Sequence, residues 1–194
     1  MRRRSIALAG AGLLAAGLAL LWQGLWIPAK AALAQILLDR AFAASAAAAG
    51  APVRAWDWAD TWPVARLAVP RLGVDLVVLA GASGEALAFG PALLDGGAVP
   101  GEAGTSVVAG HRDTHFAFLG GLVPGDRIEV MRADGRVAAF VVRATRVAAW
   151  DRPGIDAHAD GSWLVLTTCW PLDARLPGPQ RYLVVAEAVD GAGA

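Results

Sequence analysis

This sequence has little of what would point to several common classes of protein. Its net charge is zero, with 17 Lys and Arg against 17 Asp and Glu, so nothing in the charge balance suggests nucleic acid or an acidic polymer as a partner. It has a single cysteine, Cys169, which excludes an intrachain disulfide framework and a zinc site built on several cysteines. It has no internal repeat, and no alternation of strands with long helices that would predict a doubly wound sheet.

Charge is also missing from a long run near the N-terminus. After the arginine cluster 2–4, residues 5–27 carry no charged side chain. A run of this length crosses about 30 Å of hydrocarbon as a helix. Trp22 and Trp26 lie near its far end, where indole rings favour the membrane interface. We therefore expect a single-pass membrane anchor, with the arginines in the cytoplasm and the rest of the chain on the outer side of that membrane.

A cleaved signal peptide is the alternative for the same segment. The arginines would then be its basic end, and Ala29-Lys30-Ala31 or Ala41-Phe42-Ala43 its cleavage site. The apolar part of a signal peptide is only about 7–15 residues long, shorter than the run here, so we favour the uncleaved anchor. Both interpretations put the domain outside the cytoplasm.

Composition divides the chain into three parts. Residues 1–27 are expected to form a cytoplasmic tip and the membrane anchor. Residues 28–61 begin with an alanine-rich stretch; since alanine is the best helix former, they predict a helical stalk and linker, with the helix stopped at 50–52. Residues 62–194 are expected to form the main folded domain.

From Val64 onward, short runs rich in Val, Leu and Ala are separated by Gly, Pro and Asp, a texture typical of β-strands. Asp134-Gly135 is a hairpin signal, and residues 81–91 predict a short helix or turn. Together these features predict a mainly β fold, a small closed or nearly closed barrel. The predicted strands are 65–69, 75–80, 105–109, 127–133, 136–145, 163–168 and 181–186.

Cys169 follows one of these predicted strands and stands two residues before Pro171. Because proline cannot continue a central strand, the cysteine is expected at the end of a strand, beside a loop. That position suits a nucleophile held on a rigid element. The alternative is a buried apolar filler, since cysteine is among the most buried residue types.

His111 comes directly after another predicted strand and Gly110. Of the three histidines, it alone stands at a strand end. A thiol needs a basic or imidazolium neighbour, because the thiolate attacks well and the pKa of a free thiol is about 8.5. His111 is therefore the candidate partner of Cys169, and a solvated loop histidine is the alternative.

Arg181 opens the last predicted strand, 12 positions after Cys169. If the strands before and after the intervening loop pair antiparallel, the two residues are neighbours. A guanidinium stays protonated, so Arg181 is suited to donate hydrogen bonds to a carbonyl or an oxyanion. A charged surface cap on the strand is the alternative.

Together these segments resemble the sortases, a family of cysteine transpeptidases. The run 166–169, Leu-Thr-Thr-Cys, resembles the end of their Thr-Leu-x-Thr-Cys signature, although Val165 replaces its first threonine. The run 109–112, Ala-Gly-His-Arg, resembles the segment that holds their catalytic histidine. The order His, Cys, Arg is theirs too, and the resemblance covers about residues 62–189. The aromatic-Pro pair 170–171 after the cysteine is most like the Gram-negative branch, class GN.

The resemblance implies an eight-stranded sortase barrel with the active site in a groove on one side. Cys169 is then the nucleophile, His111 the proton donor and acceptor, and Arg181 the donor to the substrate carbonyl. Thr168 faces away from Cys169 if the strand is regular, so a structural role is also expected for it. The candidate substrate-binding residues are Thr167, Thr168 and Trp170.

The resemblance also implies the partners. The substrate is a protein with a C-terminal sorting signal similar to Leu-Pro-x-Thr-Gly, and an amine acceptor resolves the acyl-enzyme thioester. No cofactor and no metal are expected. Some sortases use calcium, but Asp113 and Asp126 are interpreted as loop and turn residues. Arg112 and Arg175 are charged loop candidates, with Arg175 the fallback for Arg181.

Other functions remain open at this point. A metal-dependent hydrolase would use His111, Asp113 and His115, with Cys169 as a further ligand. A non-catalytic barrel that binds a partner would leave Cys169 as a spectator. Plain peptide hydrolysis would keep the same chemistry with water in place of the amine, and the sequence does not separate it from transpeptidation.

Overall fold

The computed structural model describes residues 2–174, 176 and 178–189 of this chain. Helices are few and strands many, as the composition of the outer domain predicts. Along the chain the elements are α1 (Arg2–Ala47), β1 (Pro63–Val69), η1 (Pro70–Leu72), β2 (Val74–Ala80), α2 (Gly84–Phe89), β3 (Ala92–Leu93), β4 (Gly104–Ala109), η2 (Ala117–Gly121), β5 (Arg127–Arg132), β6 (Val137–Ala149), β7 (Ser162–Trp170) and β8 (Gln180–Ala188).

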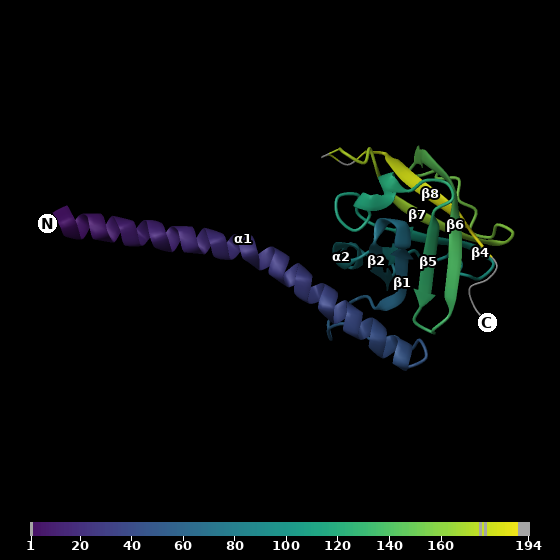
Figure 1. The fold of residues 1–194 in the computed structure, drawn as a ribbon, viewed down its shortest axis with the longest axis horizontal. Coiled ribbons are helices and arrows are strands. Elements are labelled where there is room, and N and C mark those ends of the chain that lie inside the picture. The colour runs from purple at the N-terminus through teal and green to yellow at the C-terminus, as the bar shows by residue number, and fades with distance from the viewer. Residues whose placement is uncertain (1, 175, 177, 190–194) are drawn as a thin grey trace. The chain divides into compact units, whose positions relative to one another are not determined.

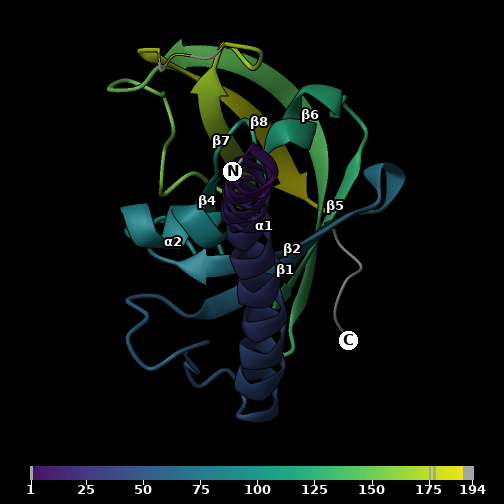
Figure 2. The ribbon, with the colours of Figure 1, turned by 90° about the vertical axis from the view of Figure 1, so that its left-hand side faces the viewer.

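The strands form a closed barrel in the order β1-β2-β3-β4-β7-β8-β6-β5. The pairs β2–β3 and β4–β7 are parallel and the other pairs are antiparallel. Figure 1 shows the hairpin of β5 and β6 beside β1, and Figure 2 shows the long strand β6 next to β8. The predicted mainly β, eight-stranded barrel is thus confirmed.

The barrel interior is filled by alternate side chains of the strands, as the two-residue period of a strand requires. Leu164 and Leu166 of β7 join Phe140 of β6 and Val184 of β8 in one buried cluster. Phe116, which lies between β4 and η2, belongs to the same cluster and is fully buried. The segment between β4 and η2 is therefore packed against the core through Phe116.

Helix α1 contains a stretch, Gly12–Ala47, that is long and apolar enough to cross a membrane, judged by length and composition alone. Pro28 lies inside the helix. Residues up to Ile36 and residues from Leu37 onward form two separate compact units. The predicted stalk of residues 28–61 is therefore shared between the two units.

The last turns of α1, from Leu37 to Ala47, belong to the unit that contains the barrel. Leu38 and Phe42 are buried against Leu79 of β2 and Ala86 of α2. Arg66 of β1 adds ion pairs to Asp39 and to Asp75. The compact unit that contains the barrel thus starts before residue 62, with a helical segment packed on the outside of β1 and β2.

Seven strands and the short helix at 84–89 match their predicted positions within a few residues. Gly135 adopts a φ of 86° in the predicted hairpin turn. Strand β3 was missed because it has only two residues and lies between Pro91 and Asp95, where turn signals dominate. It still completes the barrel, because it joins β2 to β4.

Candidate active site

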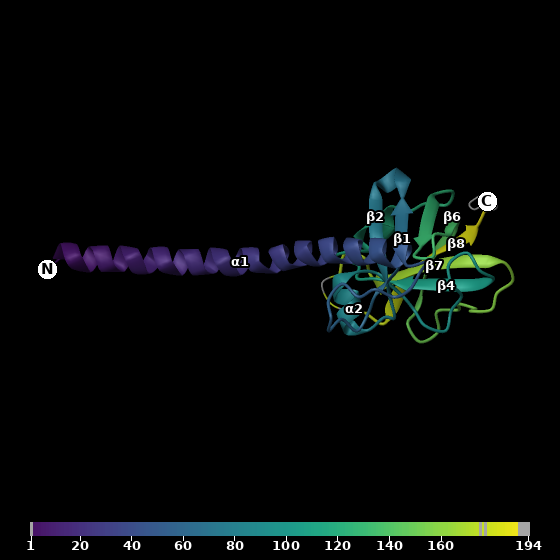
Figure 3. The ribbon, with the colours of Figure 1, turned by 90° about the horizontal axis from the view of Figure 1, so that it is seen from below.

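Cys169 lies one residue before the end of β7, in the part of the strand that pairs with β8 and two residues beyond the last β7–β4 pair, at Thr167. Strand β7 runs parallel to β4 on one side and antiparallel to β8 on the other, and Figure 3 shows β4 and β7 side by side. Cys169 is a free, half-buried thiol. The expectation that it ends a strand beside a loop is confirmed, and the backbone ladder fixes its position.

Arg181 is the direct cross-strand partner of Cys169 in the β7–β8 ladder. The predicted neighbourhood of the two residues is therefore confirmed. The Nη1 group of Arg181 donates to the carbonyl oxygens of Gly178 at 3.1 Å and of Gln180 at 2.9 Å. Among the residues described, both of these hydrogen bonds use Nη1, and none uses Nε or Nη2.

His111 stands in the turn that follows β4, two residues after the strand ends. The last β4–β7 pair is Ala109 with Thr167, and the next amide, of Gly110, still donates to the Thr167 carbonyl at 3.1 Å. The amide of Phe116 then donates back to the His111 carbonyl at 2.9 Å and closes the turn. The turn therefore leaves the barrel at the same end as Cys169, where β4 and β7 both finish.

Gly110 is required by this turn. A Cβ atom at Gly110 would lie 2.8 Å from the ring of Phe116, closer than real side chains approach. The ring of Phe116 is itself buried in the core. Glycine thus lets the backbone before His111 lie flat on an aromatic ring that the barrel holds in place.

Thr168 ties the two chain segments together. Its hydroxyl donates to the carbonyl of Gly110 at 2.6 Å, and the residue is 3% exposed. Strand alternation puts Thr168 and Trp170 on the face opposite to Cys169. The ring of Trp170 stacks on Tyr182 at 5.6 Å between centroids.

Of the three candidate substrate-binding residues, Thr167 alone shares the face of Cys169 by this alternation, and it is half-buried. In the structure the Thr168 hydroxyl is bonded to the Gly110 carbonyl and the Trp170 ring is stacked on Tyr182. The proposed contacts of all three with substrate stay predictions.

His115 lies close to His111. Burial lowers the pKa of His115 below its ordinary value, the neighbouring charge of His111 lowers it further, and a hydrogen bond to the backbone of Ala88 opposes both effects. His115 therefore connects the turn to α2 and favours its neutral form. Its sequence position alone, four residues after His111, gave no sign of this contact.

The residues of the metal-hydrolase alternative do not gather into a site. No group of three or more His, Cys, Asp and Glu side chains within the described ranges is arranged to hold a metal ion. Asp113 is exposed, and His115 is directed to the backbone of Ala88. This geometry favours the thiol chemistry over metal-dependent hydrolysis.

Asp126 is a turn residue, as predicted. Its carboxylate accepts from the amide of Val123 at 2.8 Å and forms a two-armed ion pair with Arg71 of η1. The Arg71 guanidinium holds the pKa of this carboxyl below its ordinary value. The ion pair holds the residue directly before β5 against η1.

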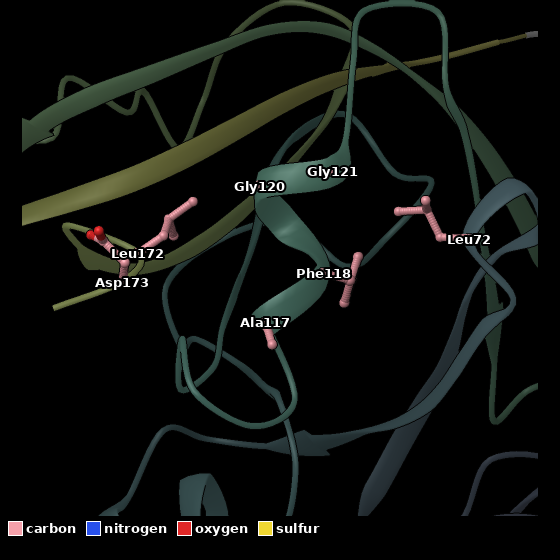
Figure 4. Close-up of a pocket in the computed structure, with 7 residues that line it drawn as sticks. All are labelled: Leu72, Ala117, Phe118, Gly120, Gly121, Leu172 and Asp173. Atoms are coloured by element: carbon pink, nitrogen blue, oxygen red, sulfur yellow. The ribbon is translucent and has the colours of Figure 1, made fainter. Parts of the chain in front are cut away.

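A cavity of about 490 Å³ opens at the end of the barrel where β7 finishes and the His111 turn begins. Its lining includes η2, which follows the His111 turn, and Leu172 and Asp173, which follow Cys169. Figure 4 shows Leu172 and Asp173 on one side of η2 and Leu72 on the other. The two loops that extend from the candidate catalytic residues thus share one hollow.

A smaller cavity of about 150 Å³ lies on the outer side of β7, under residues 154–159. Val165, which replaces the first threonine of the sortase signature, lines it together with Thr105 and Val185. Val165 is 3% exposed. The lost hydroxyl is therefore replaced by apolar packing on the same face as Cys169.

This arrangement agrees with a family model. Residues 67–189 match the model of the sortase domain. The chain belongs to the sortase family. The matched residues contain all eight barrel strands except the start of β1, and with them Cys169, His111 and Arg181.

Similar proteins agree with the family. Sortase D of Bacillus subtilis (strain 168) is 28% identical over 123 residues, which is 63% of this chain and 62% of the relative. Sortase A of Corynebacterium diphtheriae has a solved structure with a TM-score of 0.61 and 25% identity, covering 69% of this chain and 64% of that one. Sortase C-1 of Actinomyces oris gives 0.59 and 27%, covering 66% and 76%. The chain therefore spans less than two thirds of the first two relatives.

Arg112, which lies next to the candidate active site of this sortase domain, was given no role in the sequence analysis. It was noted only as a charged loop residue, yet it binds two carbonyls of the β7–β8 loop. Its place directly after His111 was the available signal, but the sequence does not tell which way an arginine in a turn points. Arg175, the fallback for Arg181, lies outside the described residues.

Proposed function

We propose that this protein is a membrane-anchored cysteine transpeptidase. It cleaves a C-terminal sorting signal similar to Leu-Pro-x-Thr-Gly in a substrate protein, and it transfers the new acyl end to an amine acceptor. Cys169, His111 and Arg181 carry the reaction. The observation that carries the proposal is the register of β8, β7 and β4, with Arg181 opposite Cys169 and the His111 turn at the same sheet edge.

The first half of the reaction forms the acyl-enzyme. The thiolate of Cys169 attacks the carbonyl carbon at the scissile bond, and a C–S bond forms. Arg181 donates hydrogen bonds to the carbonyl oxygen as negative charge develops on it. The imidazolium of His111 gives its proton to the leaving nitrogen as the C–N bond breaks. A thioester on Cys169 and a free amine result.

The second half is the reverse chemistry with a new amine. The neutral imidazole of His111 takes a proton from the incoming amine as its nitrogen attacks the thioester carbonyl. A C–N bond forms, the C–S bond breaks, and the Cys169 thiolate leaves. Water in place of the amine gives hydrolysis. The enzyme needs no cofactor for any of these steps.

The proposed location follows from α1. The positive-inside rule favours residues 2–4 in the cytoplasm, so the barrel faces the periplasm from the inner membrane. The aromatic-Pro pair after Cys169 supports membership of the Gram-negative branch. A dedicated substrate protein is expected to carry the sorting signal, an apolar segment and a basic tail.

Capture of the acyl-enzyme tests this function. The full chain, purified in detergent, is incubated with a panel of peptides that carry Leu-Pro-x-Thr-Gly variants and a C-terminal reporter. Intact-mass analysis is expected to find the acyl fragment on Cys169, and hydroxylamine is expected to release it. Added oligoglycine or diamine acceptors should convert the adduct to an amide product.

Two variants control this experiment. Cys169→Ala should give neither adduct nor product, whereas Arg143→Lys, in an exposed ion pair between β6 and β8, should behave as wild type. Cleavage by Cys169→Ala would contradict the cysteine mechanism. A wild-type thiol that never acquires the acyl fragment from any peptide of the panel would contradict the proposed signal.

A further inference from the structure

Arg112 holds the loop that follows the nucleophile. Its Nη1 donates to the carbonyl of Pro171 at 3.0 Å and its Nη2 donates to the carbonyl of Leu176 at 2.8 Å. Pro171 is two residues after Cys169, and Arg112 is the residue after His111. One half-buried guanidinium therefore joins the chain segments that leave the two candidate catalytic residues.

The joined segments also touch beyond the guanidinium. A Cβ atom on Gly120 of η2 would lie 2.9 Å from Cδ1 of Leu172, so the loop after β7 packs directly on the helix after the His111 turn. Gly178 closes the same loop, since a Cβ there would lie 2.7 Å from the carbonyl oxygen of Trp170. The described part of the loop is thus packed at Leu172 and at Gly178, and Arg112 bonds two of its carbonyls, those of Pro171 and Leu176.

Backbone pairing holds Cys169 but not His111. Strand β4 ends at Ala109, so the histidine depends on its turn for its position. The bonds from Arg112 connect this turn to the β7–β8 loop, which starts at Pro171, two residues after Cys169. Movement of the turn away from Cys169 requires that both bonds stretch or break.

We propose that Arg112 is a positioning residue for the Cys169–His111 pair, which deepens the transpeptidase function proposed above and rests on it. It acts by holding the His111 turn against the β7–β8 loop, and it does not contact the reacting atoms. Lysine cannot replace it, because a single ammonium lacks the planar fork that reaches two separate carbonyls.

The test compares Arg112→Lys, which keeps the charge, with wild type and with Arg143→Lys, all as full chains in detergent. Three quantities are measured. The first is the nuclear Overhauser contact between the Leu172 methyls and Gly120. The second is the pH profile of Cys169 alkylation, and the third is kcat and KM for a cleaved sorting peptide.

Arg112→Lys is expected to weaken the Leu172–Gly120 contact and to bring the alkylation profile close to that of His111→Ala. It is expected to lower kcat by about 10- to 100-fold, the loss typical of a misplaced catalytic group, with KM changed less than about threefold. Arg143→Lys should match wild type in all three. The thermal midpoint serves to show that the barrel of each variant is folded.

Two results would overturn the proposal. If Arg112→Lys keeps the methyl contact, the alkylation profile and kcat of wild type, Arg112 has no positioning role. If it raises KM and leaves kcat and the profile unchanged, Arg112 binds substrate instead. Failure of the transpeptidase function appears separately, as absence of an acyl-enzyme in wild type, and the methyl contact and alkylation profile still decide the role of Arg112.

Discussion

The two residues proposed to share the chemistry are held in different ways. Cys169 lies in the part of β7 that pairs with β8, directly opposite Arg181 and two residues beyond the last pair with β4. His111 sits in a turn after β4, where its position depends on the Thr168 hydroxyl, on the ring of Phe116 and on the side chain of Arg112. The nucleophile is thus fixed by strand register, whereas its basic partner depends on the backbone bonds of a single turn and on these side chains.

This difference has a consequence for mutation. Strand register is shared among many backbone hydrogen bonds, so single side-chain changes rarely shift it. A turn held by three or four contacts can move by an ångström when one is lost, and an error of that size is enough to slow a reaction about 100-fold. Substitutions around His111 should therefore lower activity more than they lower stability.

The largest effect is expected from Cys169→Ala. Acyl transfer should fall by a factor of about 1,000 or more, because removal of a nucleophile eliminates the covalent path. The thermal midpoint should stay within a few degrees of wild type, since the ladder through residue 169 is backbone. Loss of the fold together with the activity would contradict the view that register alone holds this residue.

Gly110→Ala should follow. The new methyl meets the Phe116 ring at 2.8 Å, and overpacking of this kind destabilises by about 1–3 kcal/mol. Displacement of the turn should lower the rate of acyl-enzyme formation by about 10- to 100-fold. Gly84→Ala is the matched control, because a Cβ at Gly84 meets nothing within 4 Å. Equal rates for the two variants would show that the turn tolerates movement.

Thr168→Val should have a smaller effect. It removes the bond to the Gly110 carbonyl but keeps the shape of the side chain, and loss of such a bond typically lowers the free energy of unfolding by about 1 kcal/mol. Acyl-enzyme formation should slow by roughly tenfold or less. Thr145→Val, on an exposed position of β6, should change neither quantity. A slower rate with an unchanged alkylation profile would instead favour direct substrate contact by Thr168.

The smallest effect concerns pH. The pKa of His115 is lower in the folded protein than its ordinary value, so the unfolded chain binds a proton more readily. The stability that this histidine contributes is therefore complete above its unfolded pKa of about 6.5 and is lost as the pH falls through the interval down to the lowered value.

His115→Gln should make the free energy of unfolding depend less on pH between pH 7 and pH 5, as measured by chemical unfolding at each pH. His158→Gln, at an exposed loop position, serves as the control and should retain the wild-type slope. A slope that His115→Gln leaves unchanged would contradict the burial of His115 beside His111.

The sequence was informative where backbone pattern decides the structure. The strand end at Ala109, the hairpin at Gly135 and the Cys169–Arg181 neighbourhood follow from strand alternation, turn residues and one antiparallel pairing, whereas the strand predicted to end at residue 168 continues to Trp170. The number of strands came from the resemblance, and the order of the strands was not predicted, because local patterns do not tell which distant strands pair.

The directions of the side chains could not be predicted from the sequence. Nothing in the run 110–116 indicates that Arg112 points to the β7–β8 loop or that His115 points to α2. The packing of Leu38 and Phe42 on the barrel was missed for the same reason, since an alanine-rich helix with a few larger apolar residues resembles a plain stalk. Such contacts depend on what the fold brings near each residue.

The central claim is that His111 activates Cys169. The most direct measurement is the rate at which a small thiol-selective electrophile modifies the full chain as a function of pH, in wild type and in His111→Ala, with a chelator present. Because the chain has one cysteine, every adduct reports on Cys169. We predict a structured profile in wild type that His111→Ala changes. A thiol that reacts identically in both proteins at every pH would contradict the account.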